Sequence, residues 1–178
     1  GWATPKDRHV VTADLGLYVA KYGGNPFGHA FIQVELLDNS GKVINEKVVG
    51  FYPGNAFATL VAPQQSVILD DRETGAIKHS TVSKTWELKN TSLTSQEIEK
   101  VLDTNRKYDL STYNCTDYAI EKAKQLGVDL PPWIGEDKVG STKFDFSNWI
   151  TGGPSIKLDM KKLPGMLGVD LVRLGGTW

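Results

Sequence analysis

The chain contains one cysteine, Cys115, in the stretch YNCTDYAIEKAKQLG, where a helix is expected to begin. At the first turn of a helix, unpaired backbone N–H groups and the helix dipole favour a thiolate over a thiol. A thiolate in this place could attack a carbonyl carbon and form an acyl-thioester. A lone cysteine is also often a small buried apolar residue, so residue type alone leaves both interpretations open.

A nucleophilic thiol needs a base, and the chain offers three histidines: His9, His29 and His79. His29 follows Gly28 at the start of an alternating segment, where a strand end beside a glycine turn can project an imidazole into a cleft. His9 lies near the N-terminus, and His79 lies in a Lys/Ser/Thr-rich segment that we expect to face solvent. We therefore predict His29 as the base, with a solvated turn histidine as the alternative.

A catalytic imidazole also needs an acceptor that holds its second nitrogen. The turn DNSG at 38–41 predicts a hairpin whose return strand, KVINEKVVGFY, lies beside the strand of His29. Asn45 or Glu46 would then lie near the imidazole, while Gln33 shares its face two residue pairs along. We predict Asn45 as the orienting residue, with a polar residue on the wet face of a strand as the alternative.

The acidic cluster of Asp70, Asp71 and Glu73 could bind a cation, but three carboxylates on a loop are usually solvated, and we expect that here. The sequence has no His/Cys/carboxylate cluster at zinc spacing, no P-loop and no dinucleotide fingerprint. We therefore expect no metal and no cofactor.

The elements that must position these residues follow from hydrophobic periodicity. We expect strands over 9–20, 29–37, 42–52 and 76–89, with a short strand at SVIL inside an otherwise loop-like 53–75.

Two helices are expected after the strands. The segment LTSQEIEKVLDTNRK begins with a capping box of Thr94 and Glu97. The second helix has Asn114 as its N-cap, Asp117 three residues later, and Gly127 at its end. Strands followed by helices predict an α+β fold. We expect one domain over 1–178, with 130–178 as a loop-rich C-terminal wrap.

Composition limits the classes of function. The 178 residues are enough for one full core, and the net charge of −1 gives no electrostatic case for nucleic acid. No apolar stretch approaches the roughly 20 residues that span a bilayer. The chain begins with Gly-Trp rather than Met, which is compatible with a trimmed chain or with a mature form that has lost a leader. Only the second alternative would favour a secreted or periplasmic bacterial location, so the sequence leaves the location open.

Several motifs together resemble a known family. The chain resembles circularly permuted papain-like proteins, the NlpC-type thiol hydrolase superfamily in the order with His before Cys. The segments that carry the resemblance are GHAFIQVEL, GFYPG and YDLSTYNCTDYAIEKAKQLGVDLP. The run Tyr108 to Cys115 is similar to the active-site segment of lecithin:retinol acyltransferase-like proteins. Thr116 and Asp117 stand where the retinoid acyltransferases have an acidic residue and His, and this departure argues against a lipid acyl substrate. The resemblance covers roughly residues 10 to 130, and similar bacterial domains occur in polymorphic toxins.

The resemblance implies an antiparallel sheet or half-barrel packed on a helix that carries the nucleophile. By this resemblance, Cys115 matches the nucleophile and His29 matches the base. The backbone N–H of Cys115, at the start of the helix that Asn114 caps, would donate a hydrogen bond to the oxyanion.

Three aromatic residues near the expected site could contact a substrate. The candidates for the substrate groove are Phe51 and Tyr52, at the exit of the return strand, and Tyr113, two residues before the cysteine. Packing on the core is the alternative for the Phe-Tyr pair.

Three functions follow as hypotheses. The first is a cysteine peptidase or amidase acting on a peptide or a peptidoglycan stem. The second is a lipid-directed acyltransferase or phospholipase on the same fold. The third is a binding module without chemistry. If the toxin comparison holds, an inhibitor or immunity protein is a possible partner.

Overall fold

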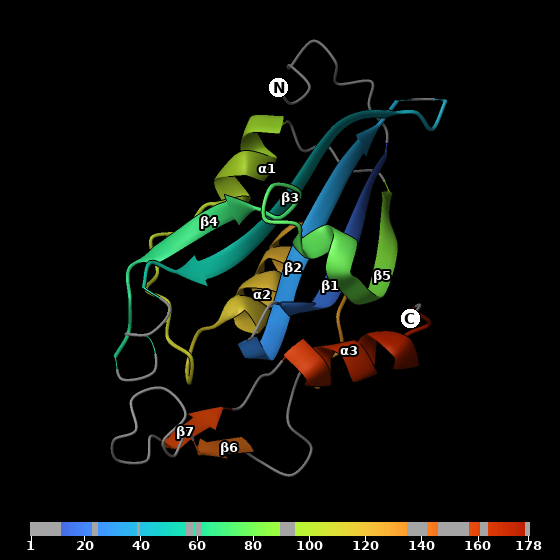
Figure 1. Ribbon diagram of the computed structural model, residues 1–178. Coiled ribbons are helices and arrows are strands. Elements are labelled where there is room, and N and C mark those ends of the chain that lie inside the picture. Colours follow the sequence, from blue (N-terminus) through green and yellow to red (C-terminus); the bar gives the residue numbers. More distant parts are fainter. Residues whose placement is uncertain are drawn as a thin grey trace.

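The computed structural model describes residues 12–22, 25–38, 40–55, 59, 62–89, 95–134, 142–145, 157–160 and 164–176 (Figure 1). Its centre is a five-stranded antiparallel sheet in the order β4-β3-β2-β1-β5. The strands are β1 (Thr12–Tyr22), β2 (Asn25–Leu37), β3 (Val43–Pro53), β4 (Ser66–Asp70) and β5 (Ser80–Lys89). A separate antiparallel pair joins β6 (Thr142–Asp145) to β7 (Lys157–Met160). The α+β class is confirmed.

The helices are α1 (Ser95–Leu102), α2 (Cys115–Gln125) and α3 (Pro164–Arg173), with a short 3-10 helix, η3 (Ala76–His79). Helix α2 packs on β2 and β3, and α3 packs on β1, β2 and β5. The main core lies between these two helices and the sheet, and Leu167 and Leu171 of α3 belong to it. The sheet is therefore covered on one face by helices from the second half of the chain.

The alternation expected in β2 is confirmed. Ala30 and Ile32 are fully buried in the main core. Phe31 points to the opposite face, where it packs with Val48 of β3 and Ala76 of η3 in a smaller cluster. Side chains alternate between the faces of a strand, so His29 shares the face of Phe31.

Two expectations about elements are corrected. Residues 76–79 form η3 rather than the start of a strand, because Gly75 has a φ of 83° and turns the chain before β5. The tail also contains the regular helix α3. The sequence signals for α3 are Pro164 at its first helical position and Gly175 after its last residue. Gly175 has a φ of 91°, a conformation that favours glycine. The predicted cap residue Thr94 lies outside the described residues.

Strands β2 and β3 separate near the site. Their described pairing runs from Leu37 opposite Val43 to Phe31 opposite Gly50. Beyond Gly50, β3 continues beside β4 as far as Pro53. Figure 1 shows β3 and β4 diverging from β2 toward the lower left, with α2 behind the sheet at this opening.

Candidate functional site

Cys115 is the first residue of α2 and is 4% exposed. Asn114 caps the helix: its side chain accepts hydrogen bonds from the backbone N–H groups of Thr116 (2.9 Å) and Asp117 (3.3 Å). The Asp117 carboxylate accepts one in return from the N–H of Asn114 at 2.9 Å. The predicted helix start and its capping box are confirmed.

Three groups meet the thiol. It forms hydrogen bonds with the imidazole of His29, the backbone N–H of Ala30 and the hydroxyl of Tyr108. Burial raises the pKa of Cys115, but these hydrogen bonds and the charge of the imidazole outweigh burial and lower the pKa below 9.0. The divergence of β2 from β3 accounts for the Ala30 contact, since the described pairing of β2 with β3 ends at Phe31.

The imidazole of His29 links the thiol to a carboxylate. Its Nε2 lies 2.9 Å from Oδ2 of Asp71, and both residues are buried. Nδ1 is the nitrogen that remains for Cys115. Burial lowers the pKa of His29, but the hydrogen bonds and charges of Asp71 and Cys115 outweigh it and raise the pKa to about 9. A carboxylate on one nitrogen also fixes the tautomer that presents Nδ1 to the thiol.

Asp71 is fully buried, and further donors satisfy it. Its Oδ1 accepts hydrogen bonds from the hydroxyls of Tyr52 and Thr74, the latter at 2.7 Å. Its backbone N–H donates to the carbonyl of Val48 at 2.9 Å, which extends the β3–β4 pairing by one residue. The ring of Tyr52 also stacks on His29 with 4.5 Å between centroids. Tyr52 therefore contacts both members of the His–Asp pair.

Gly50 leaves the space in which this pair sits. A Cβ at position 50 would lie 2.1 Å from Oδ2 of Asp71 and 2.5 Å from Nε2 of His29. Real Cβ atoms do not approach neighbours so closely. The hydrogen bond between the two side chains therefore depends on glycine here.

Tyr108 lies on the other side of the thiol. Its phenol oxygen accepts a hydrogen bond from the backbone N–H of Cys115, and its hydroxyl also bonds to the sulfur. Burial, followed by the charge of Cys115, raises the pKa of Tyr108 well above 10.0. The phenol therefore keeps its proton at neutral pH and can donate it in a hydrogen bond.

Asn45 does not orient the imidazole, contrary to the prediction. It lies opposite Leu36 on β3, and its Oδ1 accepts a hydrogen bond from the N–H of Glu46 at 3.1 Å. Leu36 is seven residues from His29 along β2, which is about 23 Å at the rise of an extended strand. The hairpin register brings Asn45 to the far end of the sheet.

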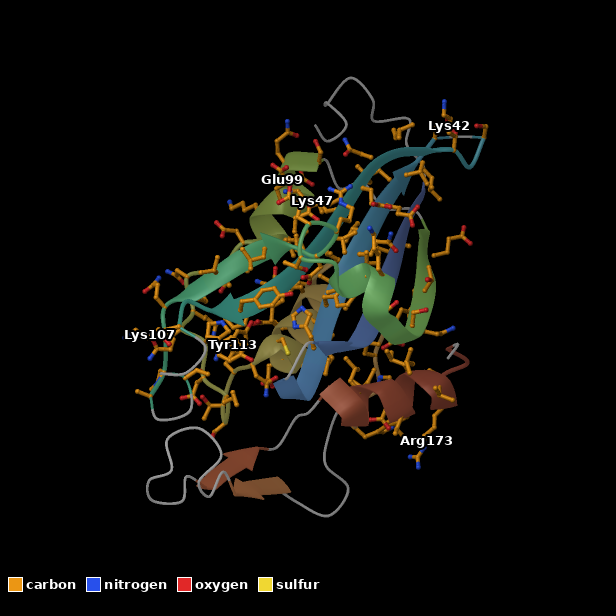
Figure 2. All side chains as sticks on the ribbon, in the orientation of Figure 1. Lys42, Lys47, Glu99, Lys107, Tyr113 and Arg173 are labelled. Atoms are coloured by element: carbon orange, nitrogen blue, oxygen red, sulfur yellow. The ribbon has the colours of Figure 1, made fainter. Side chains whose placement is uncertain are left out.

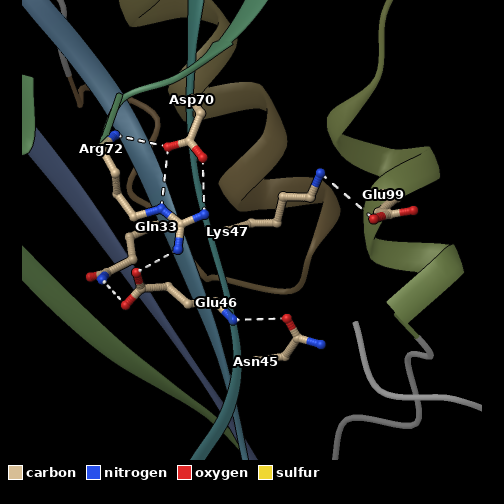
Figure 3. A network of polar contacts seen from close by, with 7 residues as sticks. All are labelled: Gln33, Asn45, Glu46, Lys47, Asp70, Arg72 and Glu99. Carbon is tan, nitrogen blue, oxygen red and sulfur yellow. Dashed lines mark hydrogen bonds and ion pairs between the residues drawn. The ribbon is translucent and has the colours of Figure 1, made fainter. Parts of the chain in front are cut away.

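The other polar candidates of β2 and β3 belong to a separate network (Figure 3). Gln33 donates to Glu46 at 3.0 Å, and Glu46 accepts from Arg72 at 3.3 Å. Arg72 also binds Asp70 at 2.9 Å. Asp70 and Arg72 are thus partners at the surface, whereas Asp71 between them points inward.

The orienting residue was missed because Asp71 belongs to a run of acidic residues that resembles a solvated loop. Only Asp71 of the three is buried; Asp70 is partly exposed and Glu73 exposed. The available signal was the alternation of SVILDD, in which Asp71 shares a face with Val67 and Leu69. Nothing local indicates that β4 pairs with β3 after the intervening loop.

The candidate groove residues have different surroundings. Phe51 is fully buried, with ring centroids 5.2 Å from Tyr108 and 5.1 Å from Tyr118. Tyr113 is also buried; its hydroxyl donates to Glu121, and it lies near the lower end of the sheet (Figure 2). The structure places both residues in the core rather than in a groove. Of the three candidates, only Tyr52 contacts His29.

His9 lies outside the described residues, and His79 ends η3. Within the described part of the chain, no three His, Cys, Asp or Glu side chains are grouped so that they could hold a metal ion. No helix among the described residues has the length and apolar character to cross a membrane.

Comparisons with protein-family models, with curated proteins and with solved structures found no match for this chain.

Proposed function

We propose that this protein is a cysteine-dependent hydrolase that cleaves an amide, in a peptide or a peptidoglycan stem, through an acyl-thioester on Cys115. One observation carries the proposal: the thiol of Cys115, the imidazole of His29 and the carboxylate of Asp71 form a buried chain of hydrogen bonds. A nucleophile, a base and an orienting acceptor in this sequence are the parts of a thiol hydrolase site. A histidine strand that precedes a cysteine-bearing helix also supports a permuted papain-like fold.

The protonation states suit this chemistry. The lowered pKa of Cys115 and the raised pKa of His29 favour a thiolate beside an imidazolium at neutral pH. The thiolate is the reactive form, and the helix start and the Ala30 N–H stabilise it further. Asp71 balances the positive charge of the imidazolium.

In the first half-reaction, Sγ of Cys115 attacks the carbonyl carbon of the amide and a C–S bond forms. The carbonyl oxygen becomes an oxyanion. The backbone N–H of Cys115, which bonds to the Tyr108 oxygen in the free protein, and the Tyr108 hydroxyl, which bonds to the sulfur, would exchange these partners for the oxyanion. The imidazolium of His29 gives its Nδ1 proton to the leaving nitrogen. The C–N bond then breaks, and the amine departs from an acyl-thioester.

In the second half-reaction, the neutral imidazole takes a proton from water, and the resulting hydroxide attacks the thioester carbonyl. The C–S bond breaks, the carboxylic acid leaves, and the thiolate–imidazolium pair is restored. Every proton in this cycle passes through Nδ1 of His29. The Asp71 carboxylate keeps Nε2 protonated throughout.

The test is turnover of a mixed library of peptides and peptidoglycan stem peptides, with products identified by mass spectrometry. We expect new amine and carboxylate termini with the native protein and none with Cys115→Ala, whose fold is checked by circular dichroism. A transient mass increase on Cys115 identifies the acyl-thioester. Hydrolysis retained by Cys115→Ala would reject the proposal. Fatty-acid release from phospholipid vesicles, with the peptides left intact, would assign the same residues to an ester substrate instead.

A further inference from the structure

The face of the sheet that carries His29 continues outward onto the edge strand β4. Leu69 lies opposite Gly50, and Val67 lies opposite Tyr52. Residues directly opposite each other in a sheet share a face, and so do residues two apart in one strand. Val67, Leu69 and Asp71 therefore form one row on the same face as Tyr52 and His29.

Two members of this row are unusually exposed for apolar residues. Val67 is 40% exposed and Leu69 is 38% exposed, whereas Ile68 between them packs against the main core. Single exposed apolar residues are ordinary. This pair differs because it flanks Tyr52 and continues a row that ends at the carboxylate bonded to His29. Edge strands usually carry charged side chains, and here the exposed face is apolar.

The chemistry of the cleavage decides which part of a substrate would cover this pair. The leaving nitrogen must face Nδ1 of His29 to receive its proton. Tyr52 stacks on the same imidazole, and Val67 and Leu69 lie next to Tyr52. A group resting on them is therefore attached to the leaving amine rather than to the acyl group.

We propose that Val67, Leu69 and Tyr52 bind an apolar side chain on the leaving-amine side of a peptide substrate. This inference rests on the proposed hydrolase function and adds its substrate preference. Strand β4 is two strand spacings, or about 10 Å, from β2, whose Ala30 N–H bonds to the thiol. An extended peptide covers about 3.3 Å per residue, so the apolar side chain belongs to about the third residue after the scissile bond.

The test uses iodoacetyl peptides, which attach to Cys115 by alkylation and extend through an amide nitrogen as the leaving amine does. Iodoacetyl-Ala-Ala-Leu-amide is compared with iodoacetyl-Ala-Ala-Ser-amide, and iodoacetamide is measured in parallel. We expect the leucine peptide to label Cys115 about 10-fold faster than the serine peptide. In the double variant Val67→Asn/Leu69→Asn, that ratio should fall to about 1.

A matched control is the double variant Val43→Asn/Ile44→Asn, whose side chains are 42% and 40% exposed at the distant hairpin end of β3. It should keep the 10-fold ratio. Unfolding curves confirm that each variant is folded. The inference would be overturned if the ratio of the two labelling rates fell equally in the control, or if it stayed unchanged in Val67→Asn/Leu69→Asn.

The parallel rate with iodoacetamide separates this inference from the proposed function. Fast labelling by iodoacetamide without a leucine preference would reject the apolar subsite and leave the activated thiol in place. Labelling at the rate of an ordinary thiol would reject the hydrolase itself, and the subsite with it.

Discussion

Gly50 of β3 lies so close to Asp71, the residue that follows β4, that a methyl group on Gly50 would lie 2.1 Å from the Asp71 carboxylate. The same methyl would meet Nε2 of His29 at 2.5 Å. The absence of a side chain at position 50 is thus a requirement of the His29–Asp71 hydrogen bond.

Gly50→Ala should abolish most of the amide hydrolysis while the protein still folds. The added methyl must displace the imidazole or the carboxylate, and misplacing a catalytic group by about 1 Å can cost on the order of 100-fold in rate. The measurements are kcat/KM and the unfolding curve of the purified variant. Gly41→Ala is the control: a Cβ there meets nothing within 4 Å, but the φ of 85° strains the backbone of the hairpin turn. This variant should lose some stability and keep its activity. Full activity in Gly50→Ala would show that the His29–Asp71 bond is dispensable.

Asp71→Asn should lower kcat by about 100-fold or more. An amide can hold the imidazole in place, but it can also select the wrong tautomer and does not balance the imidazolium charge. The pKa of His29 should fall, since the Asp71 hydrogen bond helps to raise it. Both effects can be followed by turnover and by NMR titration of the imidazole.

Asp70→Asn is the neighbouring control for this prediction. Asp70 binds Arg72 at the surface and does not contact His29. Its loss should change kcat less than 2-fold, since exposed ion pairs contribute only about 0 to 1 kcal/mol. Equal effects of the two substitutions would contradict a specific role for Asp71.

Tyr108→Phe should lower kcat by about 100-fold, within the range observed when one oxyanion donor is removed. The pKa of Cys115 should also rise, because the Tyr108 hydroxyl helps to lower it. Tyr113→Phe is the matched control, since its hydroxyl binds Glu121 instead of the thiol. A variant that loses neither turnover nor thiol acidity would exclude Tyr108 from the reaction.

The charged imidazole should make stability depend on pH. The pKa of His29 is about 9 in the folded protein and 6.5 for an ordinary histidine. Its contribution to folding stability is therefore complete below pH 6.5 and is lost as the pH rises through 9. The lowered pKa of Cys115 contributes with the opposite sign, because the stabilising thiolate is lost as the pH falls. The His29 contribution is therefore read from the imidazole itself, whose NMR titration should have its midpoint near pH 9. A midpoint near the ordinary value of 6.5 would contradict the raised pKa.

Much of the sheet and of α2 could be predicted from local patterns. The alternation in HAFIQVELL, the hairpin turn before β3 and the Asn114 cap are signals within a few residues of their effect. Helix α3 carried similar signals, Pro164 and Gly175, but they lie in a tail rich in Gly and Pro, where each also favours a turn.

The site was predictable only where its residues have local signals. Cys115 could be placed at a helix start. His29 was expected at the start of a strand beside a glycine turn, but β2 begins at Asn25 and His29 lies inside it. The position of Asp71 depends on the pairing of β4 with β3, two segments joined by a long loop. The position of Tyr108 depends on how the loop before α2 folds back. Such long-range contacts follow from packing of the whole chain rather than from periodicity.

The most direct test of the activated thiol is the rate at which iodoacetamide alkylates Cys115 as a function of pH, in the native protein and in His29→Ala. We expect fast labelling of the native protein well below pH 8, and in the variant a shift of the titration toward the value of an ordinary thiol, about 8.5. Slow labelling that rises only near pH 8.5 and does not respond to His29→Ala would contradict the thiolate–imidazolium pair, and the hydrolase function with it.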